Sequence, residues 1–447
     1  MNDSTLAIEF PVVAGRKVTC AFDGGQITSD AGLLVVGKAD RLCGLSAVMA
    51  QSVSDRRQSS KVTHEMVDLI RERVYAIAMG YEDANDLDSL RSDAALNVAC
   101  LKPASSAGAL ASQPTISRFE NSVARSGLLR MGLEMARVVV SQLPADTRKV
   151  MLDIDATDDP CHGQQELSLF DGHYGRYCYL PLYMHITDQT GRQRLLGTLL
   201  RSACGRSNKG VMSFVRLAVR AVRQRFAEAE ITIRGDCGFG YGELMNWCDA
   251  NGIGYVFAFQ SNKSTDRLVA PLEEDLSANR HLHEDGYREY GEYAYQAKTW
   301  LTSRRLIVKA EVCPSGIDMR LVVTSDVKRT PGEAYVWYTQ RGDRENRIKE
   351  MKLDLCSGRT SCHRFLANQL RLLLHSAACI LMGVLQHALE GTRWARAQVG
   401  TLRLRLLKVG ARVVQSCRKI WFHLASSFPD QDIWCLLYGK LCCDAES

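Results

Sequence analysis

The alternation of apolar and polar residues divides the chain into a helical first part and a strand-rich middle. After two short extended stretches at 7–13 and 17–22, residues 62–79 place apolar side chains at helical spacing. From residue 148 the pattern predicts three strands, a helix, a strand, a helix and a strand, at 150–156, 177–186, 194–200, 210–226, 231–234, 242–250 and 255–259. This order predicts a mixed α/β sheet with helices on its faces.

A different pattern begins near residue 260. Strand-like runs near 287–298, 305–312 and 319–324 predict a β-rich insertion that is separate from the central sheet. Leucine-rich helices from residue 362 onward are expected to cover one sheet face. The chain is thus divided into a mainly helical N-terminal domain at 1–145, an α/β domain at 146–260 and 336–390, the insertion at 261–335, and a basic helical C-terminal region at 391–447.

Composition changes this picture mainly by arguing against a membrane protein. Of the 447 residues, 46% are hydrophobic and 24% are charged, as in ordinary globular proteins. The longest apolar stretch, Leu372–Leu385, contains His375 and Ser376 and is shorter than the roughly 18 residues of a membrane span. No basic segment followed by an apolar one opens the chain, so no secretion signal is expected. We therefore expect a soluble cytoplasmic protein with no membrane partner.

The 16 cysteines do not form a recognisable framework. They are scattered, no C-x2-C pair occurs, and the closest clusters, Cys161-His162 and Cys442-Cys443, do not supply a tetrahedral set of zinc ligands. Reduced thiols are the favoured interpretation, with a zinc site as the alternative.

Positive charge is concentrated near the C-terminus. The net charge is +6, and residues 361–447 hold 11 Lys/Arg against 5 Asp/Glu, so the first 360 residues balance to zero. This excess suits either a surface that contacts phosphates or the solvated face of leucine-rich helices. Most of it comes from Arg393, Arg396, Arg403, Arg405, Lys408, Arg412, Arg418 and Lys419.

A short polar segment in the first domain, Ser112–Phe119, predicts a turn that enters a helix. Its small polar residues and Arg118 suit contacts of a helix-turn-helix with phosphates or base edges. An ordinary helix cap explains the same spacing equally well.

Three carboxylates stand out in the predicted sheet. Asp153 and Asp155 lie two residues apart on one strand, so both point to the same sheet face, where a buried strand rarely carries charge. Asp236 follows an apolar strand and is flanked by glycines that permit close backbone approach. Carboxylates that converge from neighbouring elements are the ligands that Mg²⁺ prefers. A strand end that runs into an acidic turn is the structural alternative for the first pair.

A run near residue 340 supplies a third element. Tyr338, Arg341, Glu345 and Lys352 fall within an arc of about 60° if the segment is one helix. Lys349 lies on the same face. A solvated helix with ion pairs such as Arg341–Glu345 is the alternative explanation.

The spacing Tyr-x2-Arg-x3-Glu-x6-Lys resembles the signature of bacterial insertion-sequence transposases, which are DDE enzymes with an RNase H-like catalytic fold. Four further strings resemble landmarks of insertion-sequence family 1380 over nearly the whole chain. They are GYEDANDLDSLRSD, QPTISRFEN, DIDATDD and GHYGRYCYLPL, at 80–93, 113–121, 153–159 and 172–182.

This resemblance implies a metal-binding catalytic triad of Asp155, Asp236 and Glu345, with Asp153 as a supporting or alternative ligand. The implied cofactor is Mg²⁺, with Mn²⁺ as a substitute. The implied activity is cut-and-paste transposition by a homodimer assembled on double-stranded DNA, both terminal repeats and target, in the bacterial nucleoid. The implied DNA contacts are Tyr338, Arg341 and Lys352, to which the helix projection adds Lys349 and the polar segment adds Arg118.

Three other functions remain open from the residues alone. A repressor descended from a transposase would keep the DNA-binding surfaces, although the intact carboxylates argue against it. A metal-dependent nuclease would share the triad. A glycosidase-type hydrolase would use paired carboxylates such as Asp153 and Asp155 and would bind no DNA.

Overall fold

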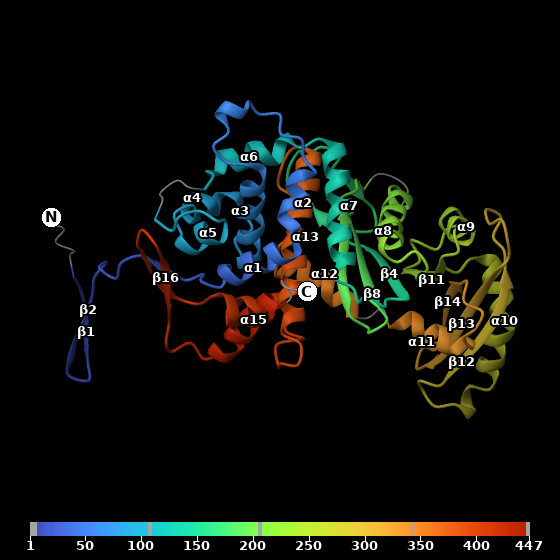
Figure 1. Ribbon diagram of the computed structural model, residues 1–447. Helices are drawn as coiled ribbons and strands as arrows, with labels where there is room; N and C mark the ends of the chain where they lie inside the picture. The colour runs from blue at the N-terminus through green and yellow to red at the C-terminus, as the bar shows by residue number, and fades with distance from the viewer. Residues whose placement is uncertain (1–6, 106–109, 204–207, 341–342, 444–447) are drawn as a thin grey trace. The chain divides into compact units, whose positions relative to one another are not determined.

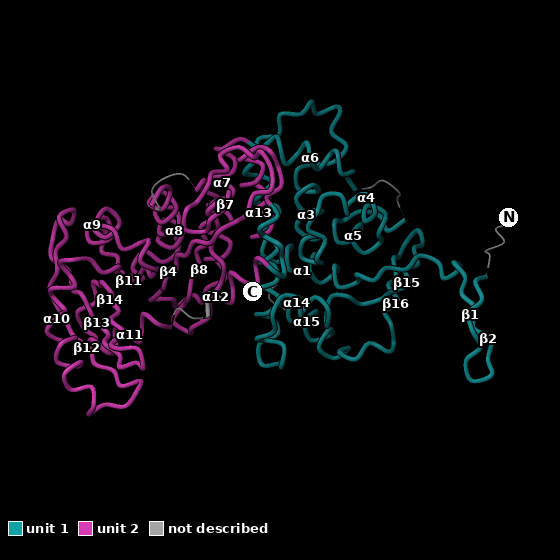
Figure 2. The backbone as a smooth tube through the Cα atoms, turned by 180° about the vertical axis from the view of Figure 1, so that it is seen from behind, with its two compact units in different colours: residues 1–123, 353–359, 377–447 teal, residues 124–352, 360–376 magenta. Residues whose placement is uncertain are grey.

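The computed structural model describes residues 7–105, 110–203, 208–340 and 343–443, with the backbone alone at 343–345 and 443 (Figure 1). The chain forms two units, which Figure 2 distinguishes by colour. The first comprises Met1–Val123, Leu353–Arg359 and Ala377–Ser447, and the second comprises Ala124–Lys352 and Thr360–Ser376. Each unit therefore joins segments that lie far apart in the sequence.

One eight-stranded sheet forms the centre of the second unit (Figure 1). β4 pairs in parallel with β10, and β10 pairs in parallel with β11. β8 and β9 continue the sheet on one side of β4 as antiparallel strands, and β14, β13 and β12 continue it beyond β11 in the same manner. This arrangement confirms the expected mixed α/β sheet. In sheet order the strands are β12 (Arg288–Tyr295), β13 (Arg304–Cys313), β14 (Gly316–Thr324), β11 (Gly254–Phe259), β10 (Glu230–Gly235), β4 (Lys149–Ala156), β8 (Leu182–Asp188) and β9 (Gln193–Leu199).

The central strands are buried on both faces, as parallel strands are when helices cover both sides. In β10 every residue from Ile231 to Gly235 is buried, and β4 is buried from Leu152 to Asp155. The predicted strand at 177–186 is interrupted, because Pro181 has no N–H to donate to a ladder. Its first part is β7 (Arg176–Tyr179), which joins β5 (Asp159–Pro160) and β6 (Leu169–Asp171) in a small separate sheet.

The predicted separate insertion at 261–335 is wrong as to its strands. β14 pairs with β11 from Val256↔Thr324 to Phe259↔Leu321, so β12, β13 and β14 extend the central sheet. Leu321, Val322 and Val323 on β14 are buried, because β14 lies between β11 and β13 in the sheet. The edge of β11 is thereby paired and not exposed. The segment also contains a helix, α10 (Lys263–Ala278), which packs on these three strands.

Helices cover the sheet of the second unit. α7 (Arg125–Ser141) and α8 (Val211–Arg225) pack on each other and on β9, and α9 (Gly242–Ala250) packs on β11. α11 (Pro331–Thr339) packs on β12 and β13. The first half of α13 (Phe365–Ala388) belongs to this unit, where Ser376 shares a 2.7 Å hydrogen bond with Thr198 of β9.

By length and composition, α13 could cross a membrane. Of its most apolar 18-residue window, 83% is buried inside the protein. That burial is typical of a core helix, and Ser376 and His375 within it are buried as well.

The first unit is largely helical, and its long helix α3 begins later than the predicted residue 62. A capping box between Glu65 and Asp68 starts the helix at Met66, and Gly80 ends it in a left-handed conformation with φ 92°. A two-stranded hairpin of β1 (Ile8–Val13) and β2 (Arg16–Cys20) precedes the helices. The helices are α1 (Leu33–Cys43), α2 (Leu45–Gln51), α3 (Met66–Met79), α4 (Leu87–Leu90), α5 (Ala94–Ala99) and α6 (Gln113–Ser122).

The basic helical region expected at 391–447 contains strands as well as helices. Between the short helix α14 (Val399–Leu402) and α15 (Gln431–Cys443), the chain forms the hairpin of β15 (Ala411–Gln415) and β16 (Ile420–Leu424). β15 also pairs with β3 (Ile27–Thr28), so β16, β15 and β3 form a three-stranded sheet from segments near the two ends of the sequence. The alternation of buried and exposed residues in β15 is that of a half-buried strand.

Part of the basic C-terminal cluster serves this unit internally. Arg403 donates to the backbone carbonyls of Ala78 and Asp354 at 2.9 and 2.7 Å, and burial lowers its pKa. Lys408 donates to Asp30 and to the Tyr81 hydroxyl, each at 2.9 Å. These two cations therefore hold the fold together, whereas Arg418 and Lys419 lie exposed at the tip of the β15–β16 hairpin.

Candidate active site

The two aspartates of β4 have different surroundings although they share a sheet face. Asp153 is fully buried and accepts two hydrogen bonds from Arg234 of β10, at 2.8 Å from Nε and 3.1 Å from Nη2. The third nitrogen of Arg234 donates to the backbone carbonyl of Trp337 in α11 at 2.8 Å. Asp153 is thus half of a bidentate buried ion pair that ties β4, β10 and α11 together.

Asp155 lies near the carboxyl end of the same strand. Its exposed fraction is 8%, and one carboxylate oxygen accepts a 2.9 Å hydrogen bond from the amide of Ala156. β10 runs parallel to β4 with Arg234 beside Asp153, and Asp236 follows directly after the last residue of β10. The negative charges of Asp155 and Asp236 both act on the same phenol, that of Tyr174. Adjacent strands lie about 4.8 Å apart. The structure therefore brings Asp155 and Asp236 together at the carboxyl ends of neighbouring parallel strands, where ligand sites of α/β sheets form.

Glycines on both sides of Asp236 permit the tight turn in which it lies. The amide of Gly238 donates to Asp236 Oδ1 at 2.8 Å, and a Cβ at position 238 would stand 3.0 Å from that oxygen. At Gly235 a Cβ would come within 2.8 Å of the Phe239 ring and 3.1 Å of Ile154. Larger residues at either position would displace the carboxylate or the strand end, which explains the sequence GDCGF here.

Two polar side chains that the sequence analysis did not select lie close to these aspartates. Tyr174, on the turn between β6 and β7, has a raised pKa because it is partly buried and because Asp158, Asp171, Asp155 and Asp236 surround it with negative charge. Burial lowers the pKa of Arg201 to about 10, and the nearby Tyr241, Asp236 and Tyr174 partly offset that effect. The site therefore combines carboxylates with a cation and a phenol.

The predicted single helix from Tyr338 to Lys352 is wrong. α11 ends at Thr339, and α12 (Asp343–Leu353) begins after a break. Tyr338 is half-buried and packs against the cluster of Tyr335, Ala334 and neighbouring sheet residues, with its ring 6.2 Å from that of Tyr335. Arg341 lies outside the described residues. Tyr338 consequently does not share a helix face with the residues of α12.

α12 carries the other predicted residues. The backbone of Glu345 lies in its first turn, whereas its side chain is outside the part that the structure describes. Lys349 is exposed. Lys352, in the last turn, donates to the backbone carbonyl and carboxylate of Asp158 and to Thr157 Oγ1, so α12 is anchored just beyond the end of β4.

Arg118 belongs to the first unit. It is exposed on α6, and its guanidinium donates to Thr115 Oγ1 at 3.1 Å, one helical turn earlier. Proline at the start of α6 and Ser112 before it are the features of an ordinary helix entry. The side chain is accessible for a DNA contact, and no described contact assigns it one.

Among the side chains that the structure describes, no group of three or more His, Cys, Asp or Glu residues is arranged to hold a metal ion. Asp155 and Asp236 supply two carboxylates, and the third predicted ligand, Glu345, is not among the described side chains. Oxygen donors of this kind fit Mg²⁺ or Mn²⁺ better than zinc, which prefers Cys and His. The described donor set thus fits a hard cation and is incomplete without a further ligand.

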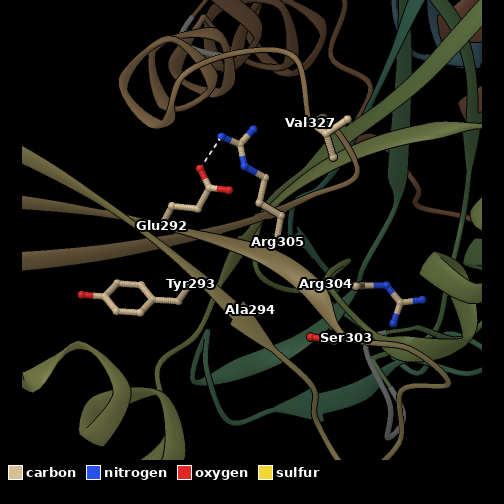
Figure 3. A pocket seen from close by; sticks show the side chains of 7 residues that line it. All are labelled: Glu292, Tyr293, Ala294, Ser303, Arg304, Arg305 and Val327. Carbon is tan, nitrogen blue, oxygen red and sulfur yellow. Dashed lines mark hydrogen bonds and ion pairs between the residues drawn. The ribbon is translucent and has the colours of Figure 1, made fainter.

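A cavity of about 610 Å³ opens at the far edge of the same sheet (Figure 3). It is lined by β12, β13 and Val327, and the side chains of Glu292 and Arg305 face each other across it in a 2.7 Å ion pair. Four strands separate β12 from β4 in the sheet order, so this cavity does not belong to the site around Asp155.

Sequence reasoning missed Tyr174, Arg201 and Asp158 as members of the site. The strings that contain Tyr174 and Asp158 had been recognised as landmarks, but neither residue could be placed next to Asp155 without the β5–β7–β6 sheet. Arg201 gave no local signal, because it follows β9 and approaches Asp236 through tertiary structure alone.

Comparison with known protein families gives a match to the family described as Transposase DDE domain group 1, over residues 10–442. No curated protein matches the chain. The family match spans nearly the whole chain and includes Asp155 on β4, Asp236 just after β10 and all of α12. The chain therefore belongs to Transposase DDE domain group 1, a family of transposases, whose substrate is DNA.

Proposed function

We propose that this chain is the cut-and-paste transposase of an insertion sequence of family 1380, acting on chromosomal DNA in the bacterial cytoplasm. The observation that supports the proposal is the parallel pairing of β4 with β10, because Asp155 lies near the carboxyl end of the first strand and Asp236 follows the carboxyl end of the second. The landmark strings support the choice of family 1380.

The strand arrangement supports an RNase H-like catalytic core. Three antiparallel strands that are consecutive in the sheet, β9, β8 and β4, are followed across the sheet by the parallel strands β10 and β11. Along the chain, α8 and α9 separate the last strands, which matches the expected order of three strands, helix, strand, helix and strand.

Asp155, Asp236 and Glu345 would hold Mg²⁺, which when bound promotes ionisation of the attacking water and stabilises charge on the phosphate. We assign Asp153 a supporting role rather than that of a ligand, because each of its carboxylate oxygens accepts a hydrogen bond from Arg234. Asp155 and Asp236 supply ligands from rigid strand ends, so little reorganisation is needed when the phosphate arrives.

The proposed reaction has two displacements at phosphorus. In the first, water attacks the phosphodiester at the element's end, the bond from phosphorus to the 3′ oxygen breaks, and that oxygen takes a proton to become a 3′-hydroxyl. In the second, the 3′-hydroxyl loses its proton and attacks a target phosphodiester, whose own 3′ oxygen leaves. The carboxylates orient both attacks, and Arg201 lies where it can offset phosphate charge near Asp236.

DNA would be held by exposed cations around this site and by the first unit. Lys349 on α12 and Arg118 on α6 are both exposed. Tyr338 and Arg341 remain proposed DNA contacts from the signature, although Tyr338 packs partly into the protein. Joining two transposon ends to one target requires two active sites, so we propose a homodimer on DNA.

The test is cleavage of the DNA that flanks the reading frame, with wild type and Glu345→Gln compared at equal DNA occupancy. The variant is expected to bind the terminal repeats with wild-type affinity and to give no Mg²⁺-dependent 3′-hydroxyl ends. Normal cleavage by Glu345→Gln would remove this residue from the site. Binding without cleavage by the wild type would favour a repressor, and cleavage without joining would favour a nuclease.

A further inference from the structure

Lys352 makes an unusually complete set of contacts for a residue expected to hold DNA. Its ammonium donates to the carbonyl oxygen of Asp158 at 2.8 Å, to Thr157 Oγ1 at 3.1 Å and to Asp158 Oδ1 at 3.2 Å. A lysine ammonium has three N–H groups, and three acceptors occupy them. A DNA phosphate would have to displace one of these acceptors.

The segment that binds Lys352 is itself held in place. Thr157 donates its amide to the carbonyl of Pro181 at 3.3 Å, and Asp159 accepts a 2.6 Å hydrogen bond from Thr360. Asp159 is 2% exposed and belongs to β5, which is paired with β7. Lys352 is therefore anchored to a fixed part of the second unit rather than to a mobile surface loop.

These contacts connect the two elements that carry the proposed ligands. Asp158 lies three residues after Asp155, and Lys352 lies seven residues after Glu345 on the same helix. Seven residues of α-helix span about 10 Å. A helix held at its last turn keeps its first turn at a defined distance from the end of β4.

We infer that Lys352 and Asp158 are positioning residues, which fix α12 so that Glu345 meets Asp155 and Asp236 at the metal. This inference rests on the proposed function, and it gives Lys352 a role different from the phosphate contact that the signature implies. Supporting groups around metal ligands typically change metal affinity or activity by about 10- to 100-fold when they are removed.

The test uses Lys352→Gln, Asp158→Asn and the double variant, with DNA binding and single-turnover cleavage measured across a Mg²⁺ titration. The inference predicts an unchanged DNA dissociation constant and salt dependence. It also predicts a cleavage rate about 10- to 100-fold lower and a higher half-saturating Mg²⁺ concentration. The double variant should be no worse than Lys352→Gln, because the side-chain contact that Asp158→Asn changes is one of the three that Lys352→Gln already removes.

Lys349→Gln is the matched control, because it removes one positive charge from the same helix at an exposed position. We expect Lys349→Gln to weaken DNA binding and to lower by about one the salt slope, which is the steepness with which the logarithm of the binding constant falls with the logarithm of salt concentration. The half-saturating Mg²⁺ concentration should not change. If Lys352→Gln behaves like Lys349→Gln, Lys352 contacts DNA and the inference is wrong. If Asp158→Asn raises the half-saturating Mg²⁺ concentration and Lys352→Gln does not, Asp158 acts on the metal directly, and the inference is also wrong.

Lys352→Arg separates the two roles even if the glutamine variant folds poorly. A guanidinium binds phosphate at least as well as an ammonium, but its planar donors do not fit three acceptors grouped around one point. The inference predicts slow cleavage with normal DNA binding, together with faster hydrogen exchange in α12. Near-normal cleavage would refute it. If wild type shows no Mg²⁺-dependent cleavage at all, the proposed function fails instead.

Discussion

Two aspartates, two residues apart on β4, are expected to respond in opposite ways to the same substitution. In Asp153→Asn the buried guanidinium of Arg234 loses its charged partner, whereas in Asp155→Asn a negative charge is removed from a place that Asp236 already makes negative. The first change should impair folding and the second should impair only catalysis. In the sequence, only the resemblance to insertion-sequence transposases distinguishes the two positions.

The magnitude for Asp153 follows from its contacts. It is fully buried and accepts from Arg234 at 2.8 and 3.1 Å. Removing one partner of such a pair typically costs about 3–5 kcal/mol, because the other charge stays buried without compensation. With a urea dependence of roughly 3 kcal/mol per molar, at the upper end of the usual range because the slope grows with chain length, the unfolding midpoint of Asp153→Asn should fall by about 1–2 M.

The assay is urea unfolding followed by fluorescence, together with the cleavage assay on refolded protein. Asp155→Asn should unfold at or above the wild-type midpoint and should cleave no DNA. Asp153→Asn should unfold early. The double variant Asp153→Leu with Arg234→Met is the control, because an apolar pair of similar size should recover more than half of the lost stability.

The reasoning is refuted if Asp153→Asn keeps the wild-type midpoint and loses cleavage while Asp155→Asn remains active. In that outcome Asp153 would be the metal ligand and its pairing with Arg234 would not persist when DNA and metal bind. A large loss of stability in Asp155→Asn would equally contradict the assignment, since it would give that carboxylate a structural role.

Three further predictions concern other parts of the chain. Glu72 is buried, which raises its pKa to about 8. Its favourable contribution to stability is therefore complete below pH 4.5 and is lost as pH rises through 8. The unfolding free energies of wild type and Glu72→Gln, measured by urea unfolding, should diverge over that interval by at most about 5 kcal/mol. Arg403→Ala should lower the melting temperature without changing the salt slope of DNA binding, whereas Arg418→Gln should lower that slope by about one and leave the melting temperature unchanged. Gly238→Ala should slow cleavage more than tenfold at nearly normal stability, because its Cβ crowds Asp236 Oδ1; a normal rate would show that this turn tolerates the shift.

The sheet was predictable where burial dictates the pattern. β10 and β4 are buried almost throughout, and their Ile, Val, Leu and Met residues mark them as strands in the sequence. The position of Asp236 directly after such a strand was visible for the same reason. The pairing of β14 with β11 was not predictable, because it joins residues 62 to 68 positions apart and leaves no local signal.

The break before α12 was missed because helical periodicity continues across it. Thr339 and Asp343 end one helix and begin the next, while the apolar spacing on either side remains compatible with a single helix. Gly342 in the sequence is a poor helix former and was the one available signal. Spacing alone therefore placed Tyr338 on a face that it does not share with Lys352.

The roles of individual charges could not be predicted, because partners decide them. Asp153 and Asp155 look alike in sequence, and only the pairing of β4 with β10 assigns Arg234 to the first. Similarly, Arg403 and Arg418 belong to one basic cluster, yet the first is half-buried and donates to backbone carbonyls. Composition predicted the excess of charge and left its distribution open.

Iron-mediated cleavage of the polypeptide tests most directly whether Asp155, Asp236 and Glu345 hold one metal. Fe²⁺ replaces Mg²⁺ at oxygen-ligand sites, and with ascorbate and peroxide it produces radicals that cut the nearby backbone. On the DNA-bound protein we predict cuts close to residues 155, 236 and 345, all suppressed by excess Mg²⁺ and lost in Asp155→Asn. Cuts near 155 and 236 without one near 345, or cuts that persist in excess Mg²⁺, would contradict the three-carboxylate site.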